Sequence, residues 1–599
     1  MEASVKVSAP DGLSPSFLGV ERSLSGRLWQ ARPWDAQEIQ ALQRGFGLSE
    51  IAARILAGRG VKASEAAGFL NPTLRQWFPD PSSFVDMDKA VEAVEEAIQS
   101  GRPCAVFADY DVDGGTSAAL LVRYFRARGR QLQVYVPDRS KEGYGPSAAA
   151  FAQLQAQGVE LVITVDCGAA AHEPLEAAAA MGLEVVVFDH HLMSGPAPRA
   201  RAVVNPNRPD CPSGQGALTA AGVVFVALAG LNRNARRKGL PGSNHLPDPM
   251  AWLDLAALGT VCDVAPLTGF NRAIVAQGLN VLGRGANIGL AALARVAGRE
   301  GSAKVYDLGF VLGPRLNAGG RIGDSSLATR LLASEDPAEV EELALRLDQL
   351  NTERRSIEQG ILAEAIAQAD GQAGKRNAVV VAAQHWHPGV IGVVAGRLKE
   401  RLLKPVIVIG GGGGDEPAKG SGRSVAGVNL GRAVAAAARD GLLLAGGGHA
   451  MAAGLSLAWA NLERFRDYLA EATAQECAAS VHEARSLWVD AVASIRALDF
   501  SLLAAIEAMG PYGAGHSEPL LALTDVRVAF AQRMKGEHVR ATLQDVGGHK
   551  IRAIAFRCAD GPMGQALLAR AGSFSALVRI SRNSYRSLDE VQAEIIDLA

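Results

Sequence analysis

The chain has 599 residues, of which 48% are hydrophobic and 5% aromatic, and its formal net charge is −2. This length predicts roughly three to five domains. No apolar run reaches the roughly 18–20 residues of a membrane helix, and no basic region followed by an apolar stretch opens the sequence, so we expect neither a membrane span nor a secretory signal. The six cysteines form no CxxC motif. This pattern is typical of buried free thiols in a reducing cytosol, so we expect a cytoplasmic protein.

Residues 1–100 are expected to be mainly helical after a loosely ordered, Pro- and Ser-punctuated start. From residue 101, short apolar runs alternate with stretches of helical length. The runs are residues 104–111, 132–139, 160–168, 184–191 and 201–207. Strands separated by helices predict a doubly wound parallel sheet, which we place in an α/β domain of residues 101–336. Residues 217–300, within that domain, are expected to be helical.

A long helix is predicted from about Pro337 to Ala369, within a connecting segment of residues 337–372. Ser334 or Asp336 can cap this helix, and Pro337 suits its first turn. At 1.5 Å per residue the helix would reach roughly 50 Å, long enough to bridge two domains. Its apolar stripe is Leu343, Leu347, Leu350, Ile357 and Ile361.

The remaining sequence predicts a second α/β domain over residues 373–480 and a C-terminal domain over residues 481–599 that contains a small β-barrel. Residues 521–588 carry eleven Lys or Arg and four Asp or Glu, an excess of +7. A basic β-rich module is suited to binding a nucleic-acid backbone. Composition alone supports a merely solvated face equally well.

Acidic and imidazole side chains follow three of the predicted strands. They are Asp109, Asp111 and Asp113 after the first strand, Asp166 after the third, and Asp189, His190 and His191 after the fourth. Because ligands of open parallel sheets bind at the carboxyl ends of the strands, we expect these clusters to converge on one crevice. Crowded carboxylates repel one another unless a cation neutralises them, and carboxylates with imidazoles favour two Mn²⁺ or Mg²⁺ ions. A single Asp is more often a turn former or helix cap, but three such clusters are poorly explained that way.

A fourth acidic position lies in the apolar segment of residues 253–267. Asp263 sits among apolar residues there, and a buried carboxylate needs a partner, which a metal provides. Asp254 is an alternative ligand, but we interpret it as a polar point on a helix.

The strings FADYDVDG, VDCG, DHH and LGTVCDVAPL resemble the signature motifs of the DHH phosphoesterases. Further strings, among them PDRSKEGYG, GPRLNAGGR, WHPGVIG, GSGRS and GGGH, extend the resemblance to the RecJ family from about residue 45 onward. The resemblance implies a metal-dependent, single-stranded-DNA-specific 5′→3′ exonuclease of DNA repair and recombination, with an OB-like C-terminal barrel. Gly115 departs from the family pattern, which has an aliphatic residue there, so the following helix is expected to start more loosely.

The resemblance assigns roles to individual residues of this sequence by their positions in the motifs. The resemblance implies that the metal ligands and catalytic residues include Asp111, Asp113, Asp166, His190 and Asp263, with Asp109 at an invariant position beside them. It implies that His191 contacts the scissile phosphate and that Asp189 orients His190. Residues implied to hold the DNA strand or its 5′ phosphate, or to face the same cleft, are Arg139, Arg315, Arg321, Ser421, Arg423 and His449.

The residue types support part of this assignment independently. The planar fork of Arg pairs two phosphate oxygens at once. Residues 420–424, Gly-Ser-Gly-Arg-Ser, offer unobstructed N–H groups and hydroxyls for an anion nest, although an ordinary flexible turn has the same composition. Arg321 suits an ion pair that caps a helix as well as a DNA contact, and Trp386 is expected to be a core residue.

Two other functions are compatible with the motifs. A DHH phosphodiesterase acting on short oligonucleotides or cyclic dinucleotides needs only the two α/β domains, so the extra barrel argues against it. A catalytically dead DNA-binding scaffold is expected to have lost ligands, and none is lost here. The resemblance further implies single-stranded DNA with a 5′ end as substrate and recruitment by a single-strand-binding protein and a helicase. We expect the protein to be a monomer.

Overall fold

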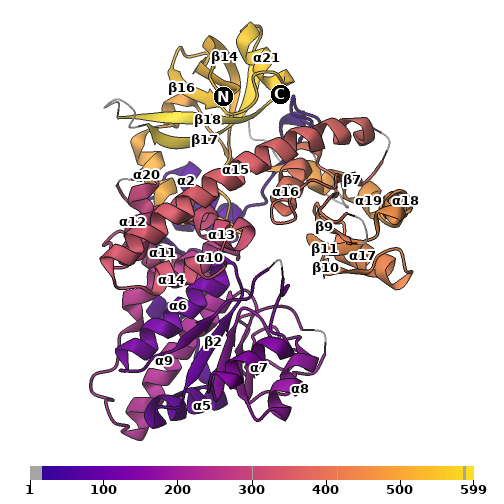
Figure 1. The fold of residues 1–599 in the computed structure, drawn as a ribbon. Coiled ribbons are helices and arrows are strands. Elements are labelled where there is room, and N and C mark those ends of the chain that lie inside the picture. Colours follow the sequence, from indigo (N-terminus) through magenta and orange to yellow (C-terminus); the bar gives the residue numbers. More distant parts are fainter. Residues whose placement is uncertain are drawn as a thin grey trace. The chain divides into compact units, whose positions relative to one another are not determined.

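The computed structural model of the chain describes residues 16–139, 141–193, 195–299, 301–374, 376–413, 416–583 and 589–599. The chain forms two compact units (Figure 1). The catalytic unit comprises residues 72–360 and 511–517, and the second unit comprises residues 1–71, 361–510 and 518–599. Among the described residues, none of the helices combines the length and the apolar character that crossing a bilayer requires.

The catalytic unit is built on the predicted parallel sheet, whose strand order is β3-β2-β4-β5-β6. The strands are β2 (Cys104–Ala108), β3 (Gln133–Tyr135), β4 (Leu161–Val165), β5 (Glu184–Phe188) and β6 (Ala202–Val204). Every residue of β2 and β4 is buried because helices cover both faces of the sheet.

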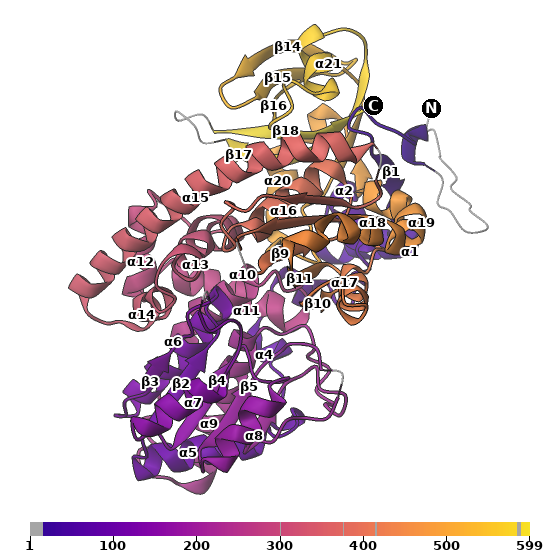
Figure 2. The same cartoon turned by 45° about the vertical axis from the view of Figure 1, so that its right-hand side comes forward.

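Each face of the sheet has its own apolar core, formed with the helices that accompany the sheet in Figure 2. The helices on one face are α5 (Met87–Ser100), α6 (Val112–Ala127) and α9 (Ala220–Lys238), and those on the other are α7 (Ala148–Ala156) and α8 (His172–Ala180). Alternate strand residues serve the two cores: Val106 points to the first face and Phe107 to the second. This arrangement leaves the carboxyl ends of the strands as the place where polar side chains can gather.

The helical character predicted for residues 217–300 is confirmed. The helices after α9 are α10 (Leu253–Cys262), α11 (Gly269–Leu282), α12 (Ile288–Val296), α13 (Gly313–Ile322) and α14 (Leu327–Ala333), with a π-helix, η4 (Asp307–Leu312), before α13. Asp254 lies on helix α10, as predicted, and its side chain is buried. Helix α10 packs against α6, α9 and α11, which leaves it no polar face. Burial raises the pKa of Asp254 to about 6, although the charge of Arg123 and local hydrogen bonds oppose this shift.

The long helix α15 spans Pro337–Ala373, four residues further than predicted. Asp336 caps it, since its carboxylate accepts a hydrogen bond of 2.9 Å from the backbone of Ala338. The predicted apolar stripe is buried except at Ile357, which is half-buried. Near that position a buried ion pair of 2.7 Å between Arg354 and Glu358 takes the place of apolar packing.

The second unit contains a five-stranded sheet with the order β10-β11-β9-β8-β7. Its strands are β7 (Val379–Ala382), β8 (Val406–Gly410), β9 (Ala418–Arg423), β10 (Ala445–His449) and β11 (Ala452–Leu457). Helices α16 (Ile391–Leu402), α17 (Leu430–Arg439) and α18 (Leu462–Ala472) accompany it. Trp386 is fully buried, as predicted.

The interpretation of residues 420–424 as a flexible turn or a backbone anion nest is wrong. Residues 418–423 form β9, a central strand paired on both sides, so its N–H groups face the neighbouring strands. The glycines serve packing instead. A Cβ on Gly420 would lie 2.5 Å from Leu455, and one on Gly422 would lie 2.6 Å from Leu430.

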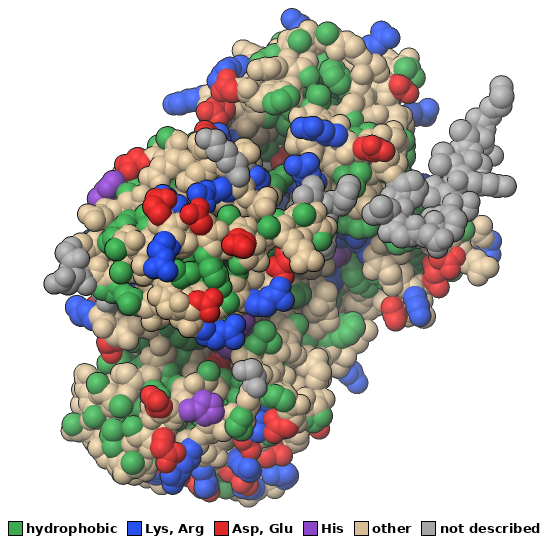
Figure 3. Space-filling view, turned by 90° about the vertical axis from the view of Figure 1, so that its right-hand side faces the viewer, with side chains coloured by type: hydrophobic (Ala, Val, Ile, Leu, Met, Phe, Trp, Pro, Cys, Tyr) green, Lys and Arg blue, Asp and Glu red, His purple; other side chains and the backbone are tan. Residues whose placement is uncertain are grey.

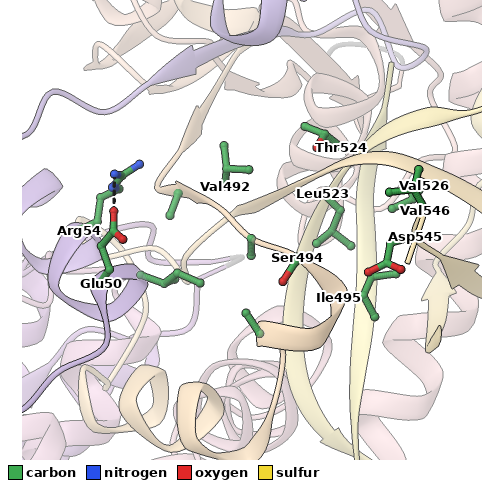
Figure 4. A pocket seen from close by; sticks show the side chains of 14 residues that line it. Glu50, Arg54, Val492, Ser494, Ile495, Leu523, Thr524, Val526, Asp545 and Val546 are labelled. Carbon is green, nitrogen blue, oxygen red and sulfur yellow. Dashed lines mark hydrogen bonds and ion pairs between the residues drawn. The ribbon is translucent and has the colours of Figure 1, made fainter. Parts of the chain in front are cut away.

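The C-terminal strands form the predicted barrel, which is closed by pairing of β14 with β17. They are β13 (Ala491–Val492), β14 (Leu521–Met534), β15 (His538–Gln544), β16 (Lys550–Ala555), β17 (Phe574–Asn583) and β18 (Glu590–Leu598). A pocket of about 430 Å³ lies beside the barrel (Figure 4). Its described lining is mainly apolar and includes Val492 and Leu523, with the 2.8 Å Glu50–Arg54 ion pair at one side. Among these described lining residues there is no His, Cys or Lys, so the pocket is a poor candidate for a catalytic site.

One strand of the second unit was not predicted. Strand β1 (Leu28–Ala31) pairs in parallel with β12 (Ser486–Val489). Trp29 of β1 is fully buried, and its indole N–H donates a 2.8 Å hydrogen bond to the buried carboxylate of Asp597. Residues 28–31 are therefore a structural part of the second unit and do not belong to a loose N-terminal region.

Replacing Asp597 with alanine is expected to destabilise the protein by about 1–3 kcal/mol, because the buried indole N–H of Trp29 loses its acceptor. Thermal unfolding followed by tryptophan fluorescence measures the effect. Asp589→Ala removes an exposed carboxylate that pairs with Arg582 and is the matched control. Equal midpoints for the two variants would contradict a stabilising role for the Trp29–Asp597 bond.

Candidate metal centre and nucleic-acid contacts

The first acidic motif is shaped by the start of helix α6. Asp111 is the N-cap residue: its carboxylate accepts hydrogen bonds from the backbone N–H groups of Asp113, at 2.8 Å, and Gly114, at 3.2 Å. A Cβ on Gly114 would lie 2.4 Å from the carbonyl oxygen of Asp109, so this tight entry into the helix requires glycine. A Cβ at Gly115 would meet only ordinary contacts, and α6 starts with a regular cap.

Asp113 lies deeper, at the N-terminus of helix α9. Its carboxylate accepts hydrogen bonds from the backbone of Ala220, at 2.7 Å, and Ala221, at 3.0 Å. Free N–H groups and the helix dipole stabilise a negative charge at that position. Gly259 of α10 allows the close approach, since a Cβ there would lie 2.6 Å from Asp113 Oδ1. Helices α6, α9 and α10 thus meet at the carboxylate of Asp113.

His190 connects the acidic motifs. Its Nε2 lies 3.2 Å from Asp166 Oδ1 and 3.8 Å from carboxylate oxygens of both Asp113 and Asp263. Asp166 follows β4 in the left-handed backbone region, with φ of 59°, and Asp263 ends helix α10. The structure therefore brings the strand-end side chains together, as predicted, and Asp263, which is 150 residues from Asp113 in the sequence, joins them from the end of α10.

The predicted role of Asp189 needs correction. Its carboxylate accepts the backbone N–H of His190, but the ring it holds is that of His191, whose Nδ1 lies 2.7 Å from Asp189 Oδ1. The reason is the tight turn after β5, which points the ring of His190 toward Asp166 and folds the ring of His191 back over Asp189. The Asp189 carboxylate also accepts the backbone N–H of Ala169, at 2.9 Å, which fixes it in place.

Tyr144, which belongs to the PDRSKEGYG motif, is a further residue of the site that was not predicted from the sequence. The Tyr144 hydroxyl lies 3.1 Å from the carbonyl oxygen of Asp166 and 3.3 Å from the His191 ring. Tyr144 therefore touches both a candidate ligand and the candidate phosphate contact. Only the motif resemblance could have indicated it.

The electrostatics of this centre demand a cation. Burial, reinforced by the neighbouring carboxylates, raises the pKa values of Asp109, Asp113 and Asp166 well above their usual range. The surroundings of Asp263, mainly through desolvation and then through Asp111, raise its pKa to about 7. Burial and the charge of His191 lower the pKa of His190 to about 4, so this imidazole is neutral and able to ligate a metal.

The donor atoms fall into three groups that are each compact enough to hold a metal ion. The groups are Asp113–His190–Asp263, Asp109–Asp111–Asp166 and Asp166–His190–His191, with the donor atoms in each within 4.8 Å of one another. Buried oxygens of Asp109 and Asp166 accept no hydrogen bond from the described residues. Buried, unsatisfied oxygens beside neutral imidazole are the donors expected for Mn²⁺ or Mg²⁺, and Asp109 lies among them.

The arginines predicted to contact DNA in this unit lie on two segments. The Arg139 guanidinium lies 5.0 Å from the ring centroid of Tyr110, the residue between Asp109 and Asp111 in the sequence. A Cβ on Gly320, the neighbour of Arg321, would lie 2.6 Å from the Tyr110 carbonyl, and the charge of Arg321 acts on the Tyr110 hydroxyl. Arg315 forms a 2.8 Å ion pair with Asp348 of α15.

The remaining predicted contacts lie on the second unit and share one face of its sheet. Ser421 and Arg423 are two residues apart on β9, so their side chains project to the same side. Arg423 and His449 both pair in register with Ala452, which puts the three residues in a row with Arg423 and His449 roughly 10 Å apart. A Cβ on Gly392, in the first turn of α16, would lie 3.0 Å from Ser421 Oγ and 3.4 Å from the Arg423 guanidinium.

The predicted basic surplus of the barrel is weaker than the sequence window suggested. Over residues 489–597 the sequence holds twelve Lys or Arg and twelve Asp or Glu, because acidic residues crowd just outside the window of residues 521–588. Several of the arginines are paired: Arg533 with Asp560, Arg552 with Glu590 and Arg582 with Asp589. Arg586, one of the eleven basic residues of that window, lies outside the described residues. Basic and acidic side chains are interspersed over much of the face in Figure 3.

Comparison with protein-family models assigns three parts of the chain. Residues 103–260 match the DHH family N-terminal domain, residues 375–475 match the DHHA1 domain, and residues 489–597 match the RecJ OB domain. The parallel sheet, its carboxylate–histidine centre and the second α/β domain thus define a DHH-type hydrolase. This result confirms the predicted fold class, including the OB-like barrel.

Relatives that match most of the chain identify its family among the DHH-type hydrolases. The single-stranded-DNA-specific exonuclease RecJ of Dickeya dadantii is 38% identical over 514 residues, covering 84% of this chain and 88% of that protein. The RecJ of Escherichia coli is 35% identical over 514 residues, with 84% and 88% covered. The crystal structure of RecJ in complex with Mn²⁺ from Thermus thermophilus matches with a TM-score of 0.79 and 30% identity, covering 95% of this chain and 79% of that one. The chain belongs to the RecJ family.

Metal binding is expected to stabilise the protein more at pH 8 than at pH 5. The raised pKa values mean that the metal-free centre holds protons that the unfolded chain loses. Its stability therefore falls as pH rises from the ordinary 3.8 of an aspartate toward the pKa of about 7 of Asp263. Bound metal replaces those protons. The thermal midpoint with and without Mg²⁺ at each pH is the measurement, and Asp166→Asn should shrink the gain. An equal gain at both pH values would mean that protons do not compete for the site.

Proposed function

We propose that this protein is a metal-dependent exonuclease that degrades single-stranded DNA from its 5′ end by a two-metal mechanism, in DNA repair and recombination. The observation that carries the proposal is the gathering of Asp109, Asp111, Asp113, Asp166, His190 and Asp263 at one edge of the parallel sheet. Family membership supports it, because the relatives are named as single-stranded-DNA-specific exonucleases. The name of the Thermus structure includes Mn²⁺, and that of a second structure from the same source includes Mg²⁺.

Two bound ions would supply an activated water and would stabilise negative charge on the phosphate. The side chain next to them, His191, is suited to the same task. Burial lowers its pKa, but its hydrogen bond and charge interaction with Asp189 outweigh burial and raise the pKa to about 9. In the metal-free centre His191 is therefore cationic at neutral pH. Asp189 holds Nδ1, so Nε2, which lies 3.3 Å from the Tyr144 hydroxyl, is the nitrogen that would donate to a phosphate oxygen in the transition state.

Selection of a 5′ end requires a group that recognises the terminal phosphate. Ser421, Arg423 and the first turn of α16 offer a hydroxyl, a planar cation and a helix N-terminus on one face of the second sheet. We assign 5′-phosphate binding to this set and strand contacts to Arg139, Arg315, Arg321 and His449. Recruitment by a single-strand-binding protein and a helicase, a monomeric state and a cytoplasmic location stay predictions.

Asp111→Ala is expected to abolish hydrolysis of a single-stranded oligonucleotide, as is excess chelator with the unchanged protein. The substitution removes both a ligand and the cap of α6, so circular dichroism should accompany the assay. Asp210→Ala, which removes an exposed carboxylate of the same unit, is the control and should keep full activity. Undiminished cleavage in chelator would exclude a metal-dependent mechanism. Cleavage of cyclic dinucleotides in preference to single strands would favour the alternative phosphodiesterase.

Arg423→Ala is expected to reduce the preference for 5′-phosphorylated over 5′-hydroxyl substrates. The loss of hydrogen bonds to a charged group is worth about 1.5–3 kcal/mol, or roughly 10- to 150-fold in the ratio of kcat/KM values. Arg439→Ala, on α17 of the same unit, is the matched control. If Arg423→Ala lowers both rates equally and leaves the ratio unchanged, the terminal phosphate is recognised elsewhere.

A further inference from the structure

An exposed aromatic pair stands on the catalytic unit and has no part in its metal centre. Tyr306 immediately precedes η4 and Phe310 lies within it, and their rings stack with centroids 5.1 Å apart and planes 21° apart. Their exposed fractions are 61% and 70%. Contiguous exposed apolar side chains are a feature of interaction sites. The two rings are stacked on each other and both are mostly exposed to solvent.

The backbone that carries the pair is fixed to the metal centre. Helix η4 is a π-helix, a rare form that is frequently found at functional sites. Cys262 Sγ lies 3.5 Å from the carbonyl oxygen of Leu308, and Cys262 directly precedes the ligand Asp263. Following this path through bonded atoms, the Cα atoms of Phe310 and Asp263 lie no more than about 20 Å apart. That distance corresponds to a few nucleotides of an extended strand.

Cationic side chains flank the aromatic pair on both sides in the sequence. Lys304 is exposed and precedes Tyr306 by two residues. On the other side, Arg315 donates a 2.8 Å hydrogen bond to the carbonyl oxygen of Val311, the residue after Phe310. Aromatic faces interleaved with cations are the combination that binds single strands, because bases stack on the rings while Lys and Arg meet the phosphates.

We propose that Tyr306 and Phe310 form a stacking platform for an unpaired base of the DNA strand, with Lys304 beside it as a phosphate contact. The platform rests on the proposed single-stranded-DNA function and adds a positioning element to it. In a duplex the base faces are already stacked on one another, so the platform selects unpaired nucleotides as well as holding them. It acts on binding and register, whereas the bond-breaking step stays with the metal centre.

The first test is equilibrium binding of a 5′-phosphorylated single strand, with chelator present so that the strand stays intact. Tyr306→Ala and Phe310→Ala should each weaken binding by about 5- to 100-fold, the usual range for losing one base–aromatic stack. Tyr306→Phe and Phe310→Trp keep a flat ring and should bind nearly as the unchanged protein does. Met250→Ala, which trims another exposed apolar side chain of the same unit, is the control. Thermal midpoints should hardly move, because the rings are exposed.

The second test identifies the base in contact. A single abasic nucleotide is moved along the strand from its 5′ end. In the unchanged protein, binding should drop at one or two adjacent positions, and in Phe310→Ala that position-specific drop should disappear. A purely structural role for Phe310 would weaken binding equally at every position and would leave the pattern intact, which would overturn the proposal.

The two proposals can fail separately. If the unchanged protein degrades single strands while Phe310→Ala binds them normally and the abasic scan is flat, the platform is wrong and the exonuclease assignment stands. In that case the aromatic pair is free to serve a protein partner. If the unchanged protein degrades no single strand but its binding shows the coupled abasic pattern, the exonuclease assignment fails and the platform stands.

Discussion

The interaction on which the molecule depends is the repulsion among carboxylates that are taken out of water and placed side by side. Asp109, Asp113 and Asp166 are all buried. An uncompensated buried charge costs several kcal/mol even after the protein relaxes around it. The protein offsets only part of this cost by itself, since His190 is neutral and the cationic ring of His191 already serves Asp189. A divalent cation completes the balance, so the centre is organised around an ion.

The local features of the fold follow from that need. Parallel strands deliver their carboxyl ends to one edge, and helix N-termini lie at the same edge, where their N–H groups stabilise negative charge. Asp111 caps α6 and Asp113 meets the start of α9, so two of the acidic residues are held by backbone donors before any ion binds. Glycines at 114 and 259 remove the side chains that would keep these segments apart.

Sequence reasoning could predict the centre because its logic is local and periodic. Short buried runs end in Asp or His, and parallel pairing forces those ends together. Asp263 was predictable for a different reason, as a carboxylate in an apolar segment. The partner of Asp189 was not predictable, because donors from His190 and His191 lie within two residues of it and only the turn geometry decides between their rings.

Other errors arise where tertiary packing overrides composition. The composition around Gly420 and Gly422 is typical of a loop, but both are strand residues. They lack a side chain because Leu455 and Leu430 occupy the space that a Cβ would need. Residues 521–588 have a basic composition because this segment ends just before Asp589 and Glu590. These two acidic residues pair with Arg582 and Arg552 of the segment. The strand at residues 28–31 was missed because its partner lies more than 450 residues away and its own pattern is only four residues long.

The pairing of β1 with β12 has a consequence for folding during synthesis of the chain. Strand β1 has no partner until residues 486–489 have been synthesised, and the indole of Trp29 lacks its acceptor until Asp597 follows. At about 5–20 residues per second, the first interval is roughly 20 to 90 s. Throughout that time β1 lacks the strand with which it later pairs. Residues 72–360 have by then been synthesised and are available to fold. The nascent chain therefore passes through a stage in which most of the catalytic unit can fold, whereas β1 still lacks its partner strand.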